Sequence, residues 1–380
     1  MWRSRDLTCL ALVVLSAGLP GAPSARADGA RPKLERKFAI GLKEGKHLSF
    51  PGWIGFDSAG RYIAVAYDTG DIRPRLTVWD AGTGKVARER ELVRVNPRHE
   101  SDFGLHAAFH PAGSHVLSDE YLAFEGDPLG TATNPLHART VTRGAEFTFQ
   151  RMSMFTVGER VIRHATVYPD HTLYIDTLDP DAMRYDPANV RTAKSFTAGK
   201  KYVLDGRAAL MAMDPGGTRV AWAERAAGGD ESDTVRDLDL ATGKSRVLRS
   251  ERPVIEVRCL AFSPDGRALV SGCADGFVRL WAAGDGRERW CVAVHEYTMG
   301  SAAFTTDGGL LACGSLKNDD ANLLFYEPAT GKVVWAGAIE ASGVISLAFN
   351  RVGDKLAVLA GNGIVYVYDV TDLRKSVRKK

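Results

Sequence analysis

The sequence predicts an all-β fold: a seven-bladed β-propeller whose blades are four-stranded antiparallel sheets. Composition gives the first observation, because 39 Gly with only 16 Pro and 45% hydrophobic residues in 380 are typical of a globular chain with many turns. The second observation is that short β-forming runs alternate with Asp-Gly turns. The third is that this unit recurs along almost the whole chain.

The clearest unit lies at residues 257–281. An apolar run at 257–262 ends at the turn Ser-Pro-Asp-Gly (263–266), and a second run follows at 268–271. The turn Ala-Asp-Gly (274–276) then precedes a third run at 277–281. Since each run is short and each turn carries Asp-Gly, the unit is predicted to be strand, turn, strand, turn, strand.

Seven copies of this unit predict seven blades. Their apolar anchor residues are 42 to 58 residues apart, slightly more than the roughly 40 to 45 of a typical propeller blade repeat. A second turn recurs in phase at 80–85, 239–244, 281–287 and 327–332, where Gly supplies the positive φ of a tight hairpin. The anchors are Phe56, Phe109, Val167, Met213, Phe262, Phe304 and Phe349, and the blades are expected to start near 53, 105, 165, 208, 257, 299 and 344.

Closure of the ring is expected to join the two ends of the propeller, which we place at residues 28–372. The seventh unit supplies only three strands, and a strand-like stretch at 34–42 has no partner of its own. We therefore expect 34–42 to complete the last blade, which removes the exposed edges of an open sheet. Residues 373–380 are predicted to be a basic, solvated tail.

The first 27 residues have the pattern of a cleaved signal peptide. Arg3 and Arg5 precede an apolar run at 7–19, and Ala25 and Ala27 present small residues to a signal peptidase. We expect a periplasmic or extracellular protein with no transmembrane span after cleavage; an uncleaved anchor is the alternative. Cleavage removes three arginines and one aspartate, so the formal charge falls from +3 to +1, and no nucleic-acid partner is expected.

No cofactor or metal is predicted. Cys259, Cys273, Cys291 and Cys313 lie in strand-like runs without a Cys-x-x-Cys pair, so buried thiols are expected, with disulfides as the alternative. Seven of the nine histidines fall between 99 and 171. A metal site there is the alternative to ordinary turn and strand histidines, since no spacing brings three imidazoles together.

These units resemble WD40 repeats. The dipeptide Trp79-Asp80 matches the family's name motif, and 185–186, 238–239, 281–282, 326–327 and 368–369 carry relaxed forms. The family's Gly-His dipeptide is absent, but His47 and His295 each stand nine residues before an anchor. The resemblance implies that such a His, with a Ser or Thr, an Asp and the Trp, forms a structural hydrogen-bonded set. In the fifth unit Ser271, Asp275 and Trp281 match three of these roles, and Pro253 occupies the place of the His.

Propeller topology places the loops between second and third strands on one face, together with the loops between blades. We call this the loop face. Its carboxylates favour a basic protein partner or a cation, and well-solvated turn residues are the alternative. The possible partner-binding residues are Trp53, Tyr67, Asp71, Arg73, Asp127, His137, Tyr202, Asp230, Glu231, Tyr297, Asp319 and Asp320.

Three functions remain open. The favoured one is a noncatalytic, monomeric scaffold that binds an unidentified protein through the loop face, as the WD40 resemblance implies. A propeller enzyme of quinoprotein-like or lactonase-like type is the second, because Thr330-Gly331-Lys332 through Trp335 looks like one quinoprotein motif. The third is a structural component of the cell envelope. A propeller fold alone does not choose among them.

Overall fold

The computed structural model describes the parts of the chain that build six complete sheets. The all-β expectation is confirmed, because these six sheets are antiparallel and four-stranded. The described residues are 30–40, 48–68, 75–91, 93–94, 107–109, 116–118, 121–122, 152–157, 162–167, 170–178, 196–225, 232–294, 299–316, 321–339 and 343–378.

Five of the six sheets consist of four consecutive strands that pair in chain order. The strands are β2 (Ser49–Phe56), β3 (Tyr62–Asp68), β4 (Arg75–Asp80) and β5 (Val86–Glu91); β10 (Met152–Val157), β11 (Ile162–Val167), β12 (Thr172–Leu178) and β13 (Phe196–Val203); β14 (Ala208–Met213), β15 (Arg219–Arg225), β16 (Asp233–Asp239) and β17 (Lys244–Val247); β18 (Val257–Phe262), β19 (Ala268–Cys273), β20 (Phe277–Ala282) and β21 (Glu288–Ala293); and β22 (Met299–Phe304), β23 (Leu311–Ser315), β24 (Leu323–Glu327) and β25 (Lys332–Gly337).

The remaining complete sheet joins the two ends of the described chain. It pairs β26 (Val344–Phe349), β27 (Lys355–Ala360) and β28 (Ile364–Asp369) with the N-terminal strand β1 (Lys33–Ala39). Along β1 and β28 the register runs from Lys33 opposite Asp369 to Ala39 opposite Ile364. Strands 320 residues apart are also tied by the Glu35–Lys355 ion pair.

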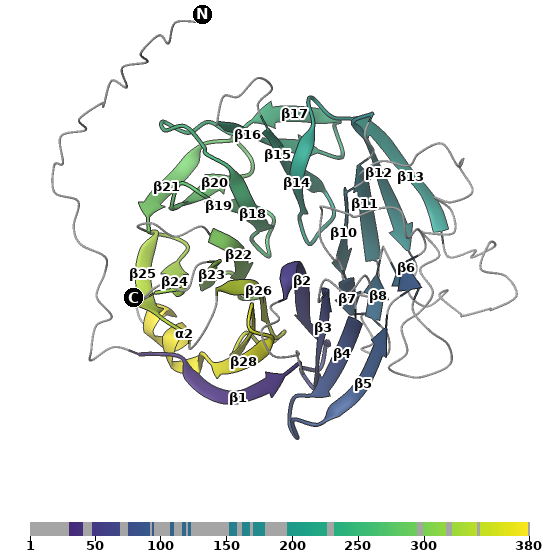
Figure 1. The fold of residues 1–380 in the computed structure, drawn as a ribbon. Helices are drawn as coiled ribbons and strands as arrows, with labels where there is room; N and C mark the ends of the chain where they lie inside the picture. Colours follow the sequence, from purple (N-terminus) through teal and green to yellow (C-terminus); the bar gives the residue numbers. More distant parts are fainter. Residues whose placement is uncertain are drawn as a thin grey trace, which may run out of the picture.

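The sheets stand around a common centre with their first strands innermost (Figure 1). Two short pairs, β6 (Val93–Arg94) with β9 (Tyr121–Leu122) and β7 (Ala107–Phe109) with β8 (Val116–Ser118), lie between the β2–β5 and β10–β13 sheets. The inner strands touch their neighbours in the order β2, β7, β10, β14, β18, β22, β26 and back to β2. Apolar cores fill the spaces between adjacent sheets, and Trp79, Trp222 and Trp281 are among the largest buried side chains.

A single hydrogen-bonded turn connects the first and second strands in five sheets. A buried polar side chain closes the first strand, and its oxygen accepts a hydrogen bond from the amide five residues later, so the turn needs no outside partner. The pairs are Asp57 with Tyr62 at 2.7 Å, Asp214 with Arg219 at 2.6 Å, Ser263 with Ala268 at 2.9 Å, Thr305 with Leu310 at 3.0 Å and Asn350 with Lys355 at 3.0 Å.

The third unit begins earlier than the sequence analysis placed it. Residue 165 lies in β11, which is the second strand of its sheet, and β10 at Met152–Val157 is the first. Thr166 and Val167, with Pro169 and Asp170 after them, have the strand-then-turn pattern of an anchor. That pattern marks any hairpin, so the second hairpin of the sheet was taken for the first.

The C-terminal segment also differs from the expected solvated tail. Residues Thr371–Arg378 form the helix α2, which follows β28 and lies at the outer edge of the sheets, beside β25 (Figure 1). Leu373 is fully buried against the last two sheets, and Arg374 donates hydrogen bonds to the Val352 carbonyl and to Asp307. The many basic residues obscured an apolar helix face in the sequence. Leu373 and Val377, one helical turn apart, form that face.

Among the described residues, no helix has both the length and the apolar character needed to cross a membrane.

Candidate interaction surface

One bond of the hydrogen-bonded set implied by the WD40 resemblance, from the Trp to the Ser, is present in the β18–β21 sheet. Trp281 on β20 donates its indole N–H to the hydroxyl of Ser271 on β19 at 2.9 Å, and both side chains are fully buried. Asp275 lies in the turn between these two strands, where its carboxylate also accepts the amide of Phe277 at 3.0 Å. Ser271 therefore satisfies a donor that would otherwise be buried without a partner.

An arginine that the sequence analysis did not single out completes this set. Arg279 on β20 is 1% exposed, and its guanidinium lies 2.9 Å from the carboxylate of Asp275. The same guanidinium donates to the carbonyl of Pro253 at 3.0 Å. Pro253 stands where the resemblance places a histidine, so Arg279 links Asp275 to that position instead. Its neighbours Val278 and Leu280 give the alternation of a solvent-facing strand residue, so no local pattern marks Arg279 as buried.

The first unit's Trp79-Asp80 pair is structural as well. Trp79 is buried and stacks on Phe38 of β1, with ring centroids 5.7 Å apart. Asp80 accepts the amide of Thr83 at 2.7 Å and the Thr83 hydroxyl at 3.0 Å. These hydrogen bonds hold the pKa of Asp80 below its usual range. Trp79 thus joins two sheets, and Asp80 closes a turn.

Three aromatic candidates for partner binding lie among the described residues, and none of them is an exposed anchor. Tyr67 is fully buried, and burial raises its pKa. Trp53 is half-buried beside Phe109, with ring centroids 6.2 Å apart. Tyr202 donates its hydroxyl to the carbonyl of Leu240 at 2.6 Å and is also half-buried.

The other partner-binding candidates lie outside the described residues. They are Asp71, Arg73, Asp127, His137, Asp230, Glu231, Tyr297, Asp319 and Asp320. The two repeat histidines, His47 and His295, lie outside them too.

A recurring hydrogen bond joins each of three sheets to the next one. A side chain on the outermost strand donates to a carbonyl 38 residues later, in the turn between the third and fourth strands of the following sheet. The donors are Tyr202 to Leu240 at 2.6 Å, Arg246 to Gly284, and Trp290 to Pro328 at 2.8 Å.

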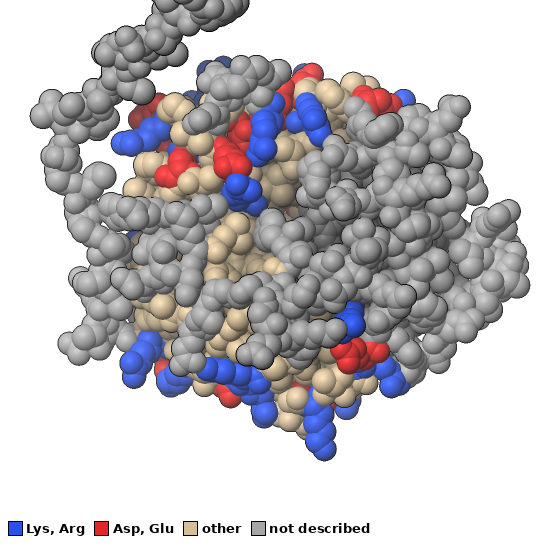
Figure 2. Space-filling view, viewed as in Figure 1, with Lys and Arg blue, Asp and Glu red and all other residues tan. Residues whose placement is uncertain are grey.

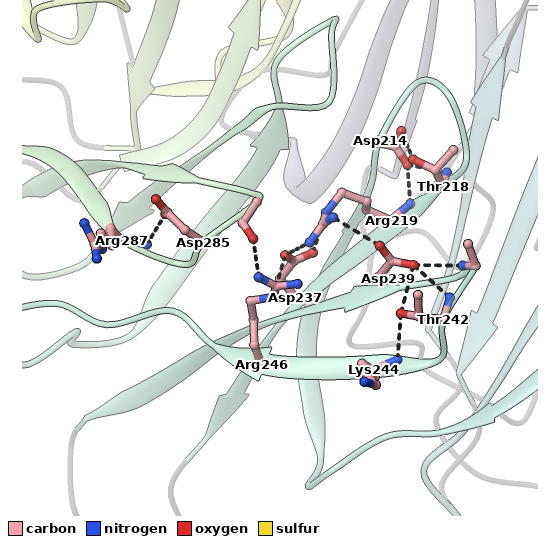
Figure 3. Close-up of polar contacts among 12 residues, drawn as sticks. Asp214, Thr218, Arg219, Asp237, Asp239, Thr242, Lys244, Arg246, Asp285 and Arg287 are labelled. Carbon is pink, nitrogen blue, oxygen red and sulfur yellow. Dashed lines mark hydrogen bonds and ion pairs between the residues drawn. The ribbon is translucent and has the colours of Figure 1, made fainter.

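The β14–β17 sheet uses charge where the β18–β21 sheet uses apolar contact. Asp237 faces Arg246 across β16 and β17, whereas Leu280 faces Trp290 at the same place in β20 and β21. Figure 3 shows Asp237 between Arg246 and Arg219, whose Nε donates to it at 3.0 Å. Burial raises the pKa of Asp237, and the hydrogen bonds from Arg219 oppose that shift. This network links the β14–β17 sheet to the β18–β21 sheet, because Arg246 also donates a hydrogen bond to the carbonyl of Gly284.

The described part of the loop face carries a second ionic cluster, formed by Arg225, Asp233, Glu256 and Arg258. Arg225 and Asp233 end β15 and begin β16, and Glu256 and Arg258 stand at the start of the inner strand β18. Glu256 lies 2.5 Å from Arg258 and 3.7 Å from Arg225. Side chains of both charges are mixed over the region of these strands in Figure 2. We call these four residues the Arg225–Arg258 cluster.

The four cysteines at 259, 273, 291 and 313 are free thiols. Burial raises the pKa of Cys259 and of Cys273 to about 12, so both are protonated at neutral pH and neither is a nucleophile. Among the described residues, no three His, Cys, Asp or Glu side chains are grouped to hold a metal ion.

Comparison with known proteins supports the WD40 resemblance. The family described as "WD domain, G-beta repeat" matches residues 248–282, the segment that contains Ser271, Asp275, Arg279 and Trp281. The chain is also similar to the SIR4-interacting protein SIF2 of Saccharomyces cerevisiae, with 28% identity over 130 residues. That alignment covers 32% of this chain and 22% of the yeast protein, so the chain matches about a fifth of its relative's length.

Proposed function

We propose that this chain, a WD40-repeat protein, is a noncatalytic scaffold that binds another protein through its loop face. WD40 repeats generally mediate contacts between proteins, and the name of the yeast relative describes an interaction with a second protein.

The observation that carries the proposal is the contrast between the loop-face connections and the turns between first and second strands. These turns lie on the opposite face, and five of them share one internally satisfied form, so they leave few groups for a partner. The longer connection 179–195, between the third and fourth strands β12 and β13, also lies on that face. Loop-face connections vary in length, from 274–276 between β19 and β20 to 226–232 between β15 and β16. Variable loops on a rigid frame are where binding residues concentrate.

The proposal includes a closed ring of seven blades. The cycle of contacts through seven inner strands supports the number seven, and the pairing of β1 with β28 supports closure. The remaining blade, which is the second along the chain, would come from the segment between β5 and β10, where β7 and β8 already pair. Such a ring is a rigid platform, because each sheet is packed on both sides.

Export through residues 1–27 belongs to the same proposal. The basic start, the apolar run and the Ala-x-Ala site support it. We place the mature chain in a periplasmic or extracellular compartment as a monomer. Its formal charge of +1, which is +3 less three arginines plus one aspartate, supports a protein partner over a nucleic acid.

Affinity capture from the envelope fraction of the source cell tests the proposal. Three forms of the chain are compared: the wild type, a loop-face variant (Asp71→Ala with Arg73→Ala and Asp319→Ala with Asp320→Ala) and an opposite-face control (Arg61→Ala with Arg267→Ala). We expect one protein that the wild type and the control recover and the loop-face variant loses. Equal recovery by all three, or no specific protein, would contradict the proposal.

A further inference from the structure

The Arg225–Arg258 cluster contains a strained glutamate. Glu256 has φ of 47°, and in the described chain only His171 shares a positive φ with it among residues other than glycine. Such a conformation is strained for a residue with a side chain and persists only where surrounding contacts enforce it. Two contacts do so here: the Glu256 carbonyl accepts the amide of Ala274 at 3.0 Å, and the carboxylate is held by two arginines.

The accessible part of the cluster has more positive than negative charge. Arg225 and Arg258 have side chains that are 56% and 39% exposed. Asp233 is buried, and its Oδ2 accepts the amide of Val257 at 2.7 Å, while Oδ1 is 3.9 Å from Arg225. Asp233 is therefore committed to the backbone of β18. Two half-exposed guanidinium groups then share the single carboxylate of Glu256.

The position of the cluster suits a partner's side chain. Arg225 flanks the connection 226–232, and Glu256 ends the connection between β17 and β18, so both kinds of loop-face connection meet here. Arg258 belongs to β18, one of the strands around the centre of the ring (Figure 1). Guanidinium groups bind carboxylates through paired N–H donors, and this pairing is strong where both groups are partly shielded from water.

We propose that Arg225 and Arg258 form a binding site for a carboxylate on an acidic segment of the partner protein, and that Glu256 occupies this site as an internal competitor in the free chain. The proposal rests on the scaffold function proposed above and names the chemistry of the partner. At this cluster the partner is acidic, which differs from the basic partner that the loop-face carboxylates favoured in the sequence analysis. Displacing the Glu256 carboxylate removes one of the two contacts that enforce its positive φ, and the hydrogen bond from the Ala274 amide remains.

Fluorescence anisotropy of a labelled oligoglutamate peptide, titrated with the full chain at low salt, tests this inference. We expect Arg258→Gln and Arg225→Gln each to weaken binding about tenfold, which corresponds to loss of one charge-assisted contact of about 1.4 kcal/mol. Glu256→Gln, which removes the competing charge, should tighten binding by a comparable factor. Arg61→Gln is the matched control, since Arg61 is exposed on the opposite face beside Asp80, and it should leave binding unchanged. Thermal unfolding of each variant checks that the fold is intact.

Three results would overturn the inference: no binding of oligoglutamate, equal losses in Arg258→Gln and Arg61→Gln, or no gain in Glu256→Gln. An oligolysine peptide of the same length that bound more tightly would overturn it too. The protein captured under "Proposed function" separates the two proposals. If it binds the Arg258→Gln variant as well as the wild type, the carboxylate site is wrong and the scaffold stands; if no partner is captured at all, the scaffold itself falls.

Discussion

Arg279 and Asp275 form an ion pair at 2.9 Å inside the β18–β21 sheet, with side chains that are 1% and 8% exposed. The WD40 resemblance implies a histidine at this point, and the chain has Pro253 in its place. Arg279 donates to the Pro253 carbonyl, so one cation replaces the histidine's link between the turn and the preceding connection. The sheet that matches the family most clearly thus uses a different hydrogen-bonded set.

This ion pair predicts a large cost for removing its cation. Arg279→Met leaves the buried Asp275 carboxylate without its counter-charge, and breaking such a pair costs about 3 to 5 kcal/mol. The measurement is the free energy of unfolding in urea. Arg289→Met is the control, because Arg289 is exposed and, among the residues described, its one hydrogen bond is to the Arg267 carbonyl at 3.3 Å. Equal losses in the two variants would show that the pair adds nothing.

Two buried tryptophans give a matched comparison. Both Trp281 and Trp222 are fully buried, but only Trp281 has a hydrogen-bond partner for its indole N–H among the described residues. Trp281→Phe removes the indole donor from the Ser271 hydroxyl, whereas Trp222→Phe removes a donor that has no acceptor in the described part of the chain. We expect Trp281→Phe to lower the free energy of unfolding by about 1 kcal/mol more than Trp222→Phe. The opposite order would contradict the assigned hydrogen bond.

Asp237 and Arg246 face each other across β16 and β17, and this predicts that apolar replacement is tolerated only when both residues are changed together. Asp237→Leu alone leaves Arg246 without a carboxylate partner and weakens the hold on Arg219, so it should destabilise the chain. Asp237→Leu with Arg246→Trp copies the Leu280 and Trp290 pair of the next sheet. Apolar side chains that face each other across two strands stabilise a sheet, so the paired change should recover part of the loss. We expect the double variant to unfold at a higher urea concentration than Asp237→Leu, and a lower one would refute this.

Asp369 gives a pH dependence at the start of α2. Its carboxylate accepts the amide of Thr371 at 2.8 Å, and hydrogen bonds from the hydroxyl and amide of Thr371 hold its pKa below the usual range. A carboxylate whose pKa falls on folding stabilises the fold above its unfolded pKa of about 3.9 and loses this contribution as the pH falls through the lower folded value. Asp369→Ala should therefore cost about 1 kcal/mol at pH 7 and less near pH 2. A pH-independent difference would contradict this.

The thiols predict slow, unfolding-limited chemistry. Cys259, Cys273 and Cys313 are buried, Cys291 is half-buried, and burial raises the pKa of each. A disulfide-exchange reagent at pH 8 should label Cys259, Cys273 and Cys313 only after denaturant is added. Mass spectrometry of the folded chain gives the readout. Rapid labelling of Cys259 in the native protein would contradict its placement.

Much of the fold could be predicted because its local signals repeat. The turns at Ser263 and Thr305 and the strands beside them lie where the Asp-Gly pattern placed them, since a tight turn needs specific residues. The pairing of 34–42 with the last strands was inferred from counting, and the structure pairs β1 with β28. Val167 was wrongly predicted to end the first strand of the third unit, because every hairpin of a sheet carries the same strand-then-turn pattern.

The polar sets were harder to predict because burial is not visible in sequence. Arg279 has the alternation of a strand residue that points to solvent, and only its ion pair with Asp275 shows that it is inside. Tyr67 and Tyr202 are aromatic residues near strand ends, as binding anchors often are. In the structure they pack inside a sheet and between two sheets. Leu373 was missed among five basic neighbours because a single buried helix face needs only two apolar residues.

A crystal structure of the exported chain tests the ring most directly. Seven four-stranded sheets are expected around one centre, with the strand through Phe38 hydrogen-bonded beside Val365 and the segment between β5 and β10 forming the seventh. Six sheets with a gap between β5 and β10, or a strand through Phe38 placed away from Val365, would contradict the account.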